Sequence, residues 1–195
     1  MCGFYGSISA EFNYSENFLK DISNSINHRG PDAHNFIKDF VGKNHIYLDH
    51  CRLSIIDLSK NGTQPFVSED KNFILVFNGE IYNFYEIREK LEKKNIKFKT
   101  KTDTEVLLQA WIMWGKDCLN QFSGMFAFSI LDKRKQKIFL VRDNFGMKPL
   151  YYYKDKNNLF FASEIICILK ILKRKVTVNT NKSYDYLIYG NHDDN

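Results

Sequence analysis

Cys2 has the clearest chemical option in the sequence, because it directly follows the initiator Met1. Methionine aminopeptidases remove a first methionine when the next residue is small, and cysteine qualifies. Cleavage would leave one residue with both a thiol nucleophile and a free α-amine, whose pKa of about 7.7–8.0 in peptides allows it to accept a proton. An isolated cysteine at position 2 also fits chance, so the case for this chemistry depends on the rest of the chain.

A series of short segments along the chain supports this interpretation of Cys2. They are Cys2-Gly3-Phe4 and residues 27–32, 52–58, 77–83, 102–105, 124–128, 142–143, 146–152 and 161–164. In this order, and over nearly the whole chain, they resemble the class II glutamine amidotransferases. The words Arg-Leu-Ser-Ile-Ile-Asp at 52–57 and Asn-Gly-Glu-Ile-Tyr-Asn at 78–83 resemble the asparagine synthetase branch of that class.

The resemblance implies a glutaminase in which Cys2 attacks the side-chain amide of glutamine, releases ammonia and leaves a thioester for water to cleave. It assigns the stabilisation of the oxyanion to the side chain of Asn78 and the backbone N–H of Gly79, since preorganised neutral donors suit that charge. Local sequence offers another interpretation, because Asn-Gly after an apolar run is the strongest short-range signal for a type I′ hairpin. The surrounding motif favours the oxyanion role.

A free amino acid must also be held by its carboxylate and its ammonium. The resemblance assigns the carboxylate to Arg52, whose planar guanidinium can donate two parallel hydrogen bonds. It assigns the ammonium to Asp103, with Glu80 nearby, and backbone contacts to Leu53 and Ile55. Residue types alone also fit a surface salt bridge for Arg52 and an acidic first helical turn for Asp103, where the helix dipole favours negative charge.

The loop at 28–32 and Cys51 allow more than one interpretation. The resemblance places the loop near the glutamine pocket and a partner domain, whereas Pro31 biases Gly30 to extended geometry and fits a purely structural turn. Cys51 adjoins Arg52, which favours a thiolate, but it has no neighbouring free amine. We therefore predict a half-buried strand residue at Cys51 and not a second nucleophile.

The hydrophobic pattern predicts the elements that position these residues. Strands are expected at 3–10, 35–40, 45–54, 73–77, 125–131, 138–142, 150–153 and 159–162, and helices at 15–26, 82–94, 102–114 and, capped by Ser163, to 172. Residues 142–152 are expected to be a mainly architectural strand-turn-strand. Strands in runs and helices in blocks indicate an α+β domain. The resemblance specifies a four-layer αββα sandwich of the N-terminal nucleophile hydrolase type.

Composition limits the other classes of function. The chain has 195 residues, a net charge of +5 and basic clusters that fit solvated helix faces, so we expect no nucleic-acid partner. The apolar runs are too short to span a membrane, and no secretory signal is visible, which predicts a cytoplasmic protein with free thiols. The four cysteines and five histidines follow no ligand spacing, and we expect no metal site.

We divide the chain into a glutaminase domain at 1–180 and a segment at 181–195 that resembles the start of the passage into a synthetase domain. The resemblance implies that glutamine hydrolysis needs no cofactor. It implies ATP and magnesium for a synthetase domain, in cis or in trans, that amidates aspartate, and it is compatible with a homodimer. Other ammonia acceptors, such as a sugar or a secondary metabolite, remain alternatives. A non-catalytic module conflicts with the complete set of residues assigned above.

Overall fold

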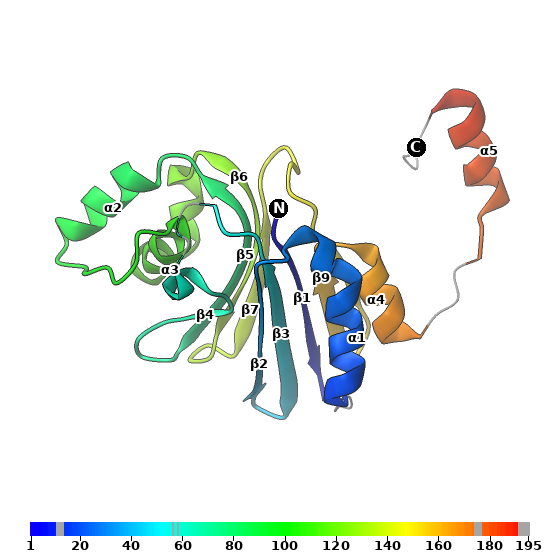
Figure 1. The fold of residues 1–195 in the computed structure, drawn as a ribbon, viewed down its shortest axis with the longest axis horizontal. Helices are drawn as coiled ribbons and strands as arrows, with labels where there is room; N and C mark the ends of the chain where they lie inside the picture. The colour runs from blue at the N-terminus through cyan, green and yellow to red at the C-terminus, as the bar shows by residue number, and fades with distance from the viewer. Residues whose placement is uncertain (11–13, 56, 58, 174–176, 191–195) are drawn as a thin grey trace.

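The computed structural model describes residues 1–10, 14–55, 57, 59–173 and 177–190 (Figure 1). Its strands are β1 Gly3–Ser9, β2 Ala33–Val41, β3 Asn44–Arg52, β4 Phe66–Val67, β5 Phe73–Ile81, β6 Gly124–Asp132, β7 Lys137–Arg142, β8 Tyr151–Lys154 and β9 Asn158–Ala162. Its α-helices are α1 Glu16–Ile26, α2 Phe84–Glu92, α3 Asp103–Trp114, α4 Ile165–Leu172 and α5 Thr180–Tyr189. Short 3-10 helices cover Asn27–Arg29, Lys60–Gly62 and Gly115–Gln121.

The strands form two antiparallel sheets, one of five strands in the order β2-β3-β1-β9-β8 and one of four in the order β4-β5-β6-β7. One apolar cluster lies between the sheets, a second lies between the five-stranded sheet and helices α1 and α4, and a third lies under α2 and α3. The layers therefore run helix, sheet, sheet, helix (Figure 1), which confirms the predicted α+β sandwich.

Strand β1 explains how the N-terminus reaches the interior. Successive side chains of a strand point to opposite faces, so Phe4 enters the cluster between the sheets and Tyr5 enters the one under α1 and α4. Both side chains are fully buried. Because β1 lies in the middle of its sheet, Cys2 is held at the end of a strand that is covered on both faces.

Helix α3 begins and ends as the sequence predicts. The Thr102 hydroxyl accepts the Glu105 N–H at 3.2 Å, and Gly115 follows the helix with a φ of 58°. The Glu105 carboxylate accepts the backbone N–H groups of Lys99 and Thr100. This cap buries the first turn of α3 against the sheet, and Asp103 is in that turn.

Two local predictions are wrong. Strand β5 does not end at Phe77 but continues through Asn78 and Gly79, which pair with β6, so this dipeptide is not a hairpin turn. Ser163 does not cap α4, because the N-cap of that helix is Glu164. The Ser163 hydroxyl instead accepts the buried Phe4 N–H at 3.1 Å. In both cases a distant strand supplies the partner that local sequence cannot show.

The segment between β7 and β8 is architectural, as predicted, and it crosses from one sheet to the other. The Asp143 carboxylate organises this turn by accepting the N–H groups of Phe126, Phe145, Met147 and Lys148. These bonds place the side chain of Lys148 at the cleft described below.

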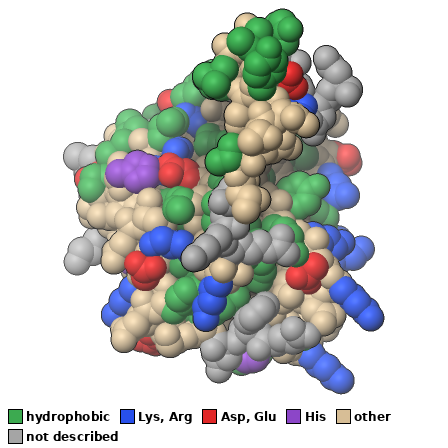
Figure 2. Space-filling view, turned by 90° about the vertical axis from the view of Figure 1, so that its right-hand side faces the viewer, with side chains coloured by type: hydrophobic (Ala, Val, Ile, Leu, Met, Phe, Trp, Pro, Cys, Tyr) green, Lys and Arg blue, Asp and Glu red, His purple; other side chains and the backbone are tan. Residues whose placement is uncertain are grey.

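Helix α5 stands away from the sandwich (Figure 1), and its apolar side chains are exposed to solvent (Figure 2). It begins at Thr180, where the sequence suggests a domain boundary; residues 191–195 lie outside the described part of the chain. Among the described residues, no helix combines the length and the apolar character that crossing a membrane requires.

Candidate active site

A cleft with a volume of about 180 Å³ opens at the N-terminal end of β1. All site residues predicted from the sequence line it, namely Cys2, Arg52, Leu53, Ile55, Asn78, Gly79, Glu80 and Asp103. They come from both sheets, from the start of α3 and from the loop after β3. Two further residues of the motif in that loop, Ile56 and Leu58, lie outside the described residues.

A backbone N–H and an arginine side chain hold Cys2. Its sulfur accepts the Leu53 N–H at 3.3 Å, and its carbonyl accepts a hydrogen bond from Arg29 Nε at 3.0 Å. Burial raises the pKa of the thiol, and the Leu53 N–H opposes that rise. The thiol therefore needs a base beside it to become a nucleophile.

The Gly79 N–H faces the cleft. On the same strand, the Phe77 N–H donates to Gln64 Oε1 at 2.6 Å, and the Ile81 N–H donates to Asp103 Oδ2 at 3.2 Å. Alternate residues of a strand direct their N–H groups to the same edge, so the N–H of Gly79 points that way as well. Since Gln64 and Asp103 line the cleft, this N–H is aimed into it.

Asn78 presents an unused donor. Its side chain is 1% exposed, and Nδ2 has no hydrogen-bond partner among the described residues. A buried amide without a partner costs stability and calls for an explanation. Asn78 lines the same cleft as Cys2 and Gly79, so this donor is available to an acceptor that enters the cleft.

Arg52 is nearly buried and firmly anchored. Nη1 donates to the Ser59 carbonyl at 2.7 Å, and Nη2 donates to the Asp57 carbonyl. A Cβ atom at Gly62 would lie 2.5 Å from Nη2, so a glycine is needed where the guanidinium packs. The guanidinium has five N–H donors, and those not used by these carbonyls can serve a ligand carboxylate.

Asp103 is a buried carboxylate that lines the same cleft. It is 5% exposed, and burial raises its pKa to about 6. The N–H groups of Ile81 and Thr104 oppose the rise, while the nearby Glu80 reinforces it. A bound ammonium would satisfy this carboxylate, which has the chemistry expected of the substrate-binding residue.

The loop at 28–32 lies against the nucleophile. Arg29, which holds the Cys2 carbonyl, also donates to Glu164 Oε1 at 3.0 Å, and His28 Nε2 lies 2.9 Å from the same oxygen. A Cβ atom on Gly30 would approach the Cys51 carbonyl to 2.3 Å. The loop thus combines a tight structural turn with support for Cys2, so both interpretations of the sequence contain part of the answer.

Lys148 and Gln64 also line the cleft, although the sequence did not single them out. Lys148 is 6% exposed, and its Nζ lies 3.0 Å from the sulfur of Met1. The only sequence signal for Lys148 was its position next to Pro149, in the turn between β7 and β8. Gln64 could not be found by spacing, because its role depends on its bonds to Phe77 and Thr104.

Cys51 lies in β3, as predicted, but it is buried rather than half-buried, at 1% exposure. Burial, reinforced by Asp49, raises the pKa of its thiol to about 12. In the metal-free protein this disfavours the thiolate that Arg52 was considered to favour, which agrees with the prediction that Cys51 is not a second nucleophile.

A model of the glutamine amidotransferase domain matches residues 1–195. The chain belongs to this family. Among its relatives, a putative glutamine-hydrolysing asparagine synthetase of Methanocaldococcus jannaschii is 42% identical over 93% of this chain and 38% of its own length. A glutamine-hydrolysing asparagine synthetase of Bacillus subtilis is 41% identical over 84% of this chain. This amidotransferase domain covers only 26% of that second relative.

Solved structures agree on the fold of the amidotransferase domain. A glutamine phosphoribosylpyrophosphate amidotransferase of B. subtilis superposes with a TM-score of 0.69 at 21% identity, over 86% of this chain and 43% of that one. An allosteric regulatory enzyme of purine biosynthesis superposes with a TM-score of 0.70 at 20% identity, over 87% and 43%. The resemblance confirms the fold of the N-terminal nucleophile hydrolases.

Proposed function

We propose that this domain hydrolyses glutamine to glutamate and ammonia through a thioester on Cys2. Removal of Met1 exposes the α-amine of Cys2, which takes the thiol proton while the sulfur attacks the side-chain amide carbon. The proton then passes to the leaving ammonia, and water cleaves the thioester. The nucleophile and its base are on one residue, so no histidine is required.

The buried, unpartnered Nδ2 of Asn78 is the observation that carries this proposal. Together with the Gly79 N–H, it would supply a pair of neutral donors in the cleft that holds the sulfur, and such donors stabilise a tetrahedral oxyanion. Arg52 would bind the glutamine carboxylate, and Asp103, with Glu80, would bind its ammonium. Leu53 and Ile55 would add backbone contacts.

We further propose that the ammonia serves ATP-dependent amidation of aspartate by a synthetase domain, in cis or in trans. The names of the relatives and the share of their lengths that this chain spans support that acceptor. ATP and magnesium would belong to the synthetase domain, and hydrolysis itself would need no cofactor. A protein of Gibberella zeae named as an amidase is 38% identical over 72% of this chain, which keeps another acceptor as the alternative.

The deciding experiment compares the mature chain with a Cys2→Ala variant. Native mass spectrometry should show loss of Met1, and the mature chain should release glutamate and ammonia from glutamine. The variant should fold normally and release neither. A non-cleavable N-terminal extension should be equally inactive, and an active extended protein would refute the α-amine as the base.

A second assay tests whether glutamine hydrolysis and asparagine formation belong to separate domains. With glutamine, aspartate and magnesium-ATP, the chain at 1–195 should form glutamate without pyrophosphate or asparagine. Addition of a synthetase domain should yield asparagine only when ATP and aspartate are both present. Asparagine made by the purified chain alone would contradict the proposal.

A further inference from the structure

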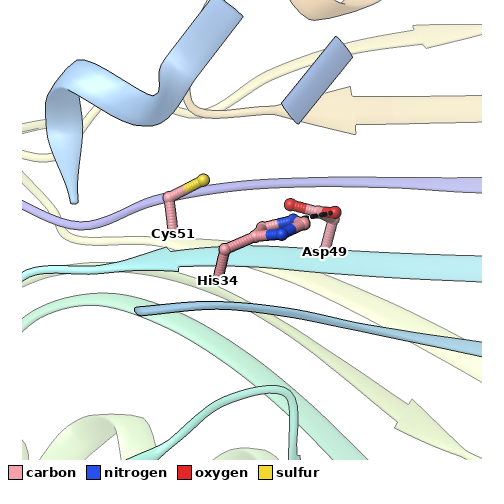
Figure 3. A group of neighbouring side chains, drawn as sticks. All are labelled: His34, Asp49 and Cys51. Carbon is pink, nitrogen blue, oxygen red and sulfur yellow. Dashed lines mark hydrogen bonds and ion pairs between the residues drawn. The ribbon is translucent and has the colours of Figure 1, made fainter. Parts of the chain in front are cut away.

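A second group of polar side chains lies on the face of the five-stranded sheet that α1 and α4 cover. It consists of His34, Asp49 and Cys51 (Figure 3), whose ligand atoms all lie within 4.8 Å of one another. His34 on β2 pairs with Cys51 on β3, and Asp49 precedes Cys51 by two residues on the same face. Strand pairing thus gathers residues whose sequence spacing shows no pattern.

One of the two carboxylate oxygens of Asp49 has no hydrogen-bond partner among the described residues. Its side chain is fully buried, and Oδ2 lies 2.8 Å from His34 Nε2, 2.8 Å from Ser23 Oγ and 2.9 Å from the Tyr47 hydroxyl. The other oxygen, Oδ1, is buried without a partner among the described residues. Figure 3 shows this oxygen on the side of Asp49 that faces the sulfur of Cys51.

We propose that these three residues bind a borderline-soft divalent metal ion of the zinc class, independently of the glutaminase chemistry. Imidazole nitrogen, carboxylate oxygen and thiolate sulfur are all zinc ligands, whereas magnesium and calcium require oxygen donors. Tetrahedral coordination would bring the ligand atoms to roughly 3.3–3.8 Å from one another. Binding would therefore draw the three ligand atoms closer than their present spacing of up to 4.8 Å, and water would take the fourth position.

The charges balance in the buried site. As the metal–sulfur bond forms, the S–H bond of Cys51 breaks and its proton passes to solvent. The ion's two positive charges then meet one thiolate and one carboxylate. The Nε2 proton that neutral His34 donates to Asp49 moves through solvent to Nδ1, which frees the Nε2 lone pair for the ion. Tyr47 and Ser23 would keep Asp49 oriented, as outer-shell donors do in metal sites.

A metal ion could reach the site from solvent, and its binding would affect the neighbouring strand. The His34 side chain is 33% exposed on β2, an edge strand, so the site opens to solvent there. Cys51 pairs with Gly3 and precedes Arg52, so a bound ion would brace the strand beside the glutaminase cleft. This proposed site departs from the expectation, based on the spacing of cysteines and histidines in the sequence, that the protein has no metal site.

Cobalt titration of a Cys2→Ala protein tests the site, because that background removes the N-terminal thiol–amine chelate. We expect one equivalent of Co²⁺ to give a thiolate-to-cobalt absorption band that Zn²⁺ abolishes and Mg²⁺ does not. An added Cys51→Ser change should remove the band. Tyr47→Phe should weaken binding on the order of tenfold, and Cys118→Ala, another buried cysteine, should change nothing.

His34→Gln keeps the test decisive if Cys51→Ser fails to fold, since His34 is partly exposed. Zn²⁺ should raise the Tm of the Cys2→Ala protein and leave that of the same protein with His34→Gln unchanged. A Co²⁺–thiolate band that survives Cys51→Ser, an equal Zn²⁺ effect on Tm with His34→Gln, or no band in the Cys2→Ala protein would overturn the proposal.

Discussion

The side-chain amide of Asn78 faces the same cleft as the thiol of Cys2, although the two residues belong to different sheets. Cys2 leads into β1 of the five-stranded sheet, and Asn78 lies in β5 of the other. The sandwich therefore assembles nucleophile and donor only when its two sheets pack. Because the two residues belong to separate segments, the contributions of Cys2 and Asn78 to activity can be tested by separate mutations.

Asn78→Ala should lower kcat for glutamine by roughly 10²–10³, the usual loss for one oxyanion donor, with little change in KM. The Tm should stay equal or rise, because the substitution removes a buried donor that has no partner. Steady-state kinetics and thermal melts test both effects. A change in KM alone would make Asn78 a substrate contact instead.

Arg52→Lys should raise KM strongly and leave kcat nearly unchanged. A single ammonium can reproduce neither a bidentate fork nor the bonds to the Asp57 and Ser59 carbonyls. Arg88→Lys is the matched control, since Arg88 also bonds a carbonyl, that of Thr100, but does not line the cleft. Equal KM values for the two variants would exclude Arg52 from carboxylate binding.

Asp103 should impose a pH dependence on glutamine binding. Its pKa in the fold is about 6, so the carboxylate that would bind the ammonium is lost as the pH falls through that value. Glutamine affinity of the Cys2→Ala protein should therefore drop about tenfold per unit below pH 6, measured by calorimetry. An affinity independent of pH between 5 and 7 would contradict the assignment.

The same pKa predicts a stability effect of opposite direction. A folded-state pKa above the ordinary 3.8 means that the ionised carboxylate destabilises the fold, fully above about pH 6 and not at all below the unfolded value. Asp103→Asn should thus weaken glutamine binding yet stabilise the protein at pH 7, by at most about 3 kcal/mol. Denaturant melts at pH 7 and pH 4 measure the difference, which should shrink at pH 4.

Ser163→Ala should destabilise the fold by about 1–3 kcal/mol, because it leaves the buried Phe4 N–H without its acceptor. Ser183→Ala is the control, since that hydroxyl bonds the Asn179 carbonyl on the exposed helix α5. Denaturant unfolding compares the two. Equal midpoints would show that water or a shift of β1 replaces the lost bond.

Local sequence was sufficient for much of the fold. Apolar spacing placed α3 correctly, and the hydrophobic pattern placed most strands within a few residues. The motif at Cys2 and the ordered segments after it indicated the chemistry, because that chemistry requires particular residue types. Such signals are short-range, and they survive in the sequence without knowledge of the tertiary structure.

Tertiary structure decided the features that depend on pairing between distant segments. Asn78 and Gly79 continue a strand because β6 pairs with them, although the dipeptide itself favours a turn. Ser163 bonds Phe4 across a sheet instead of capping a helix. His34 meets Cys51 only through the register of β2 and β3. The sequence specifies each residue's local preference, whereas burial and strand register determine which side chains share a space.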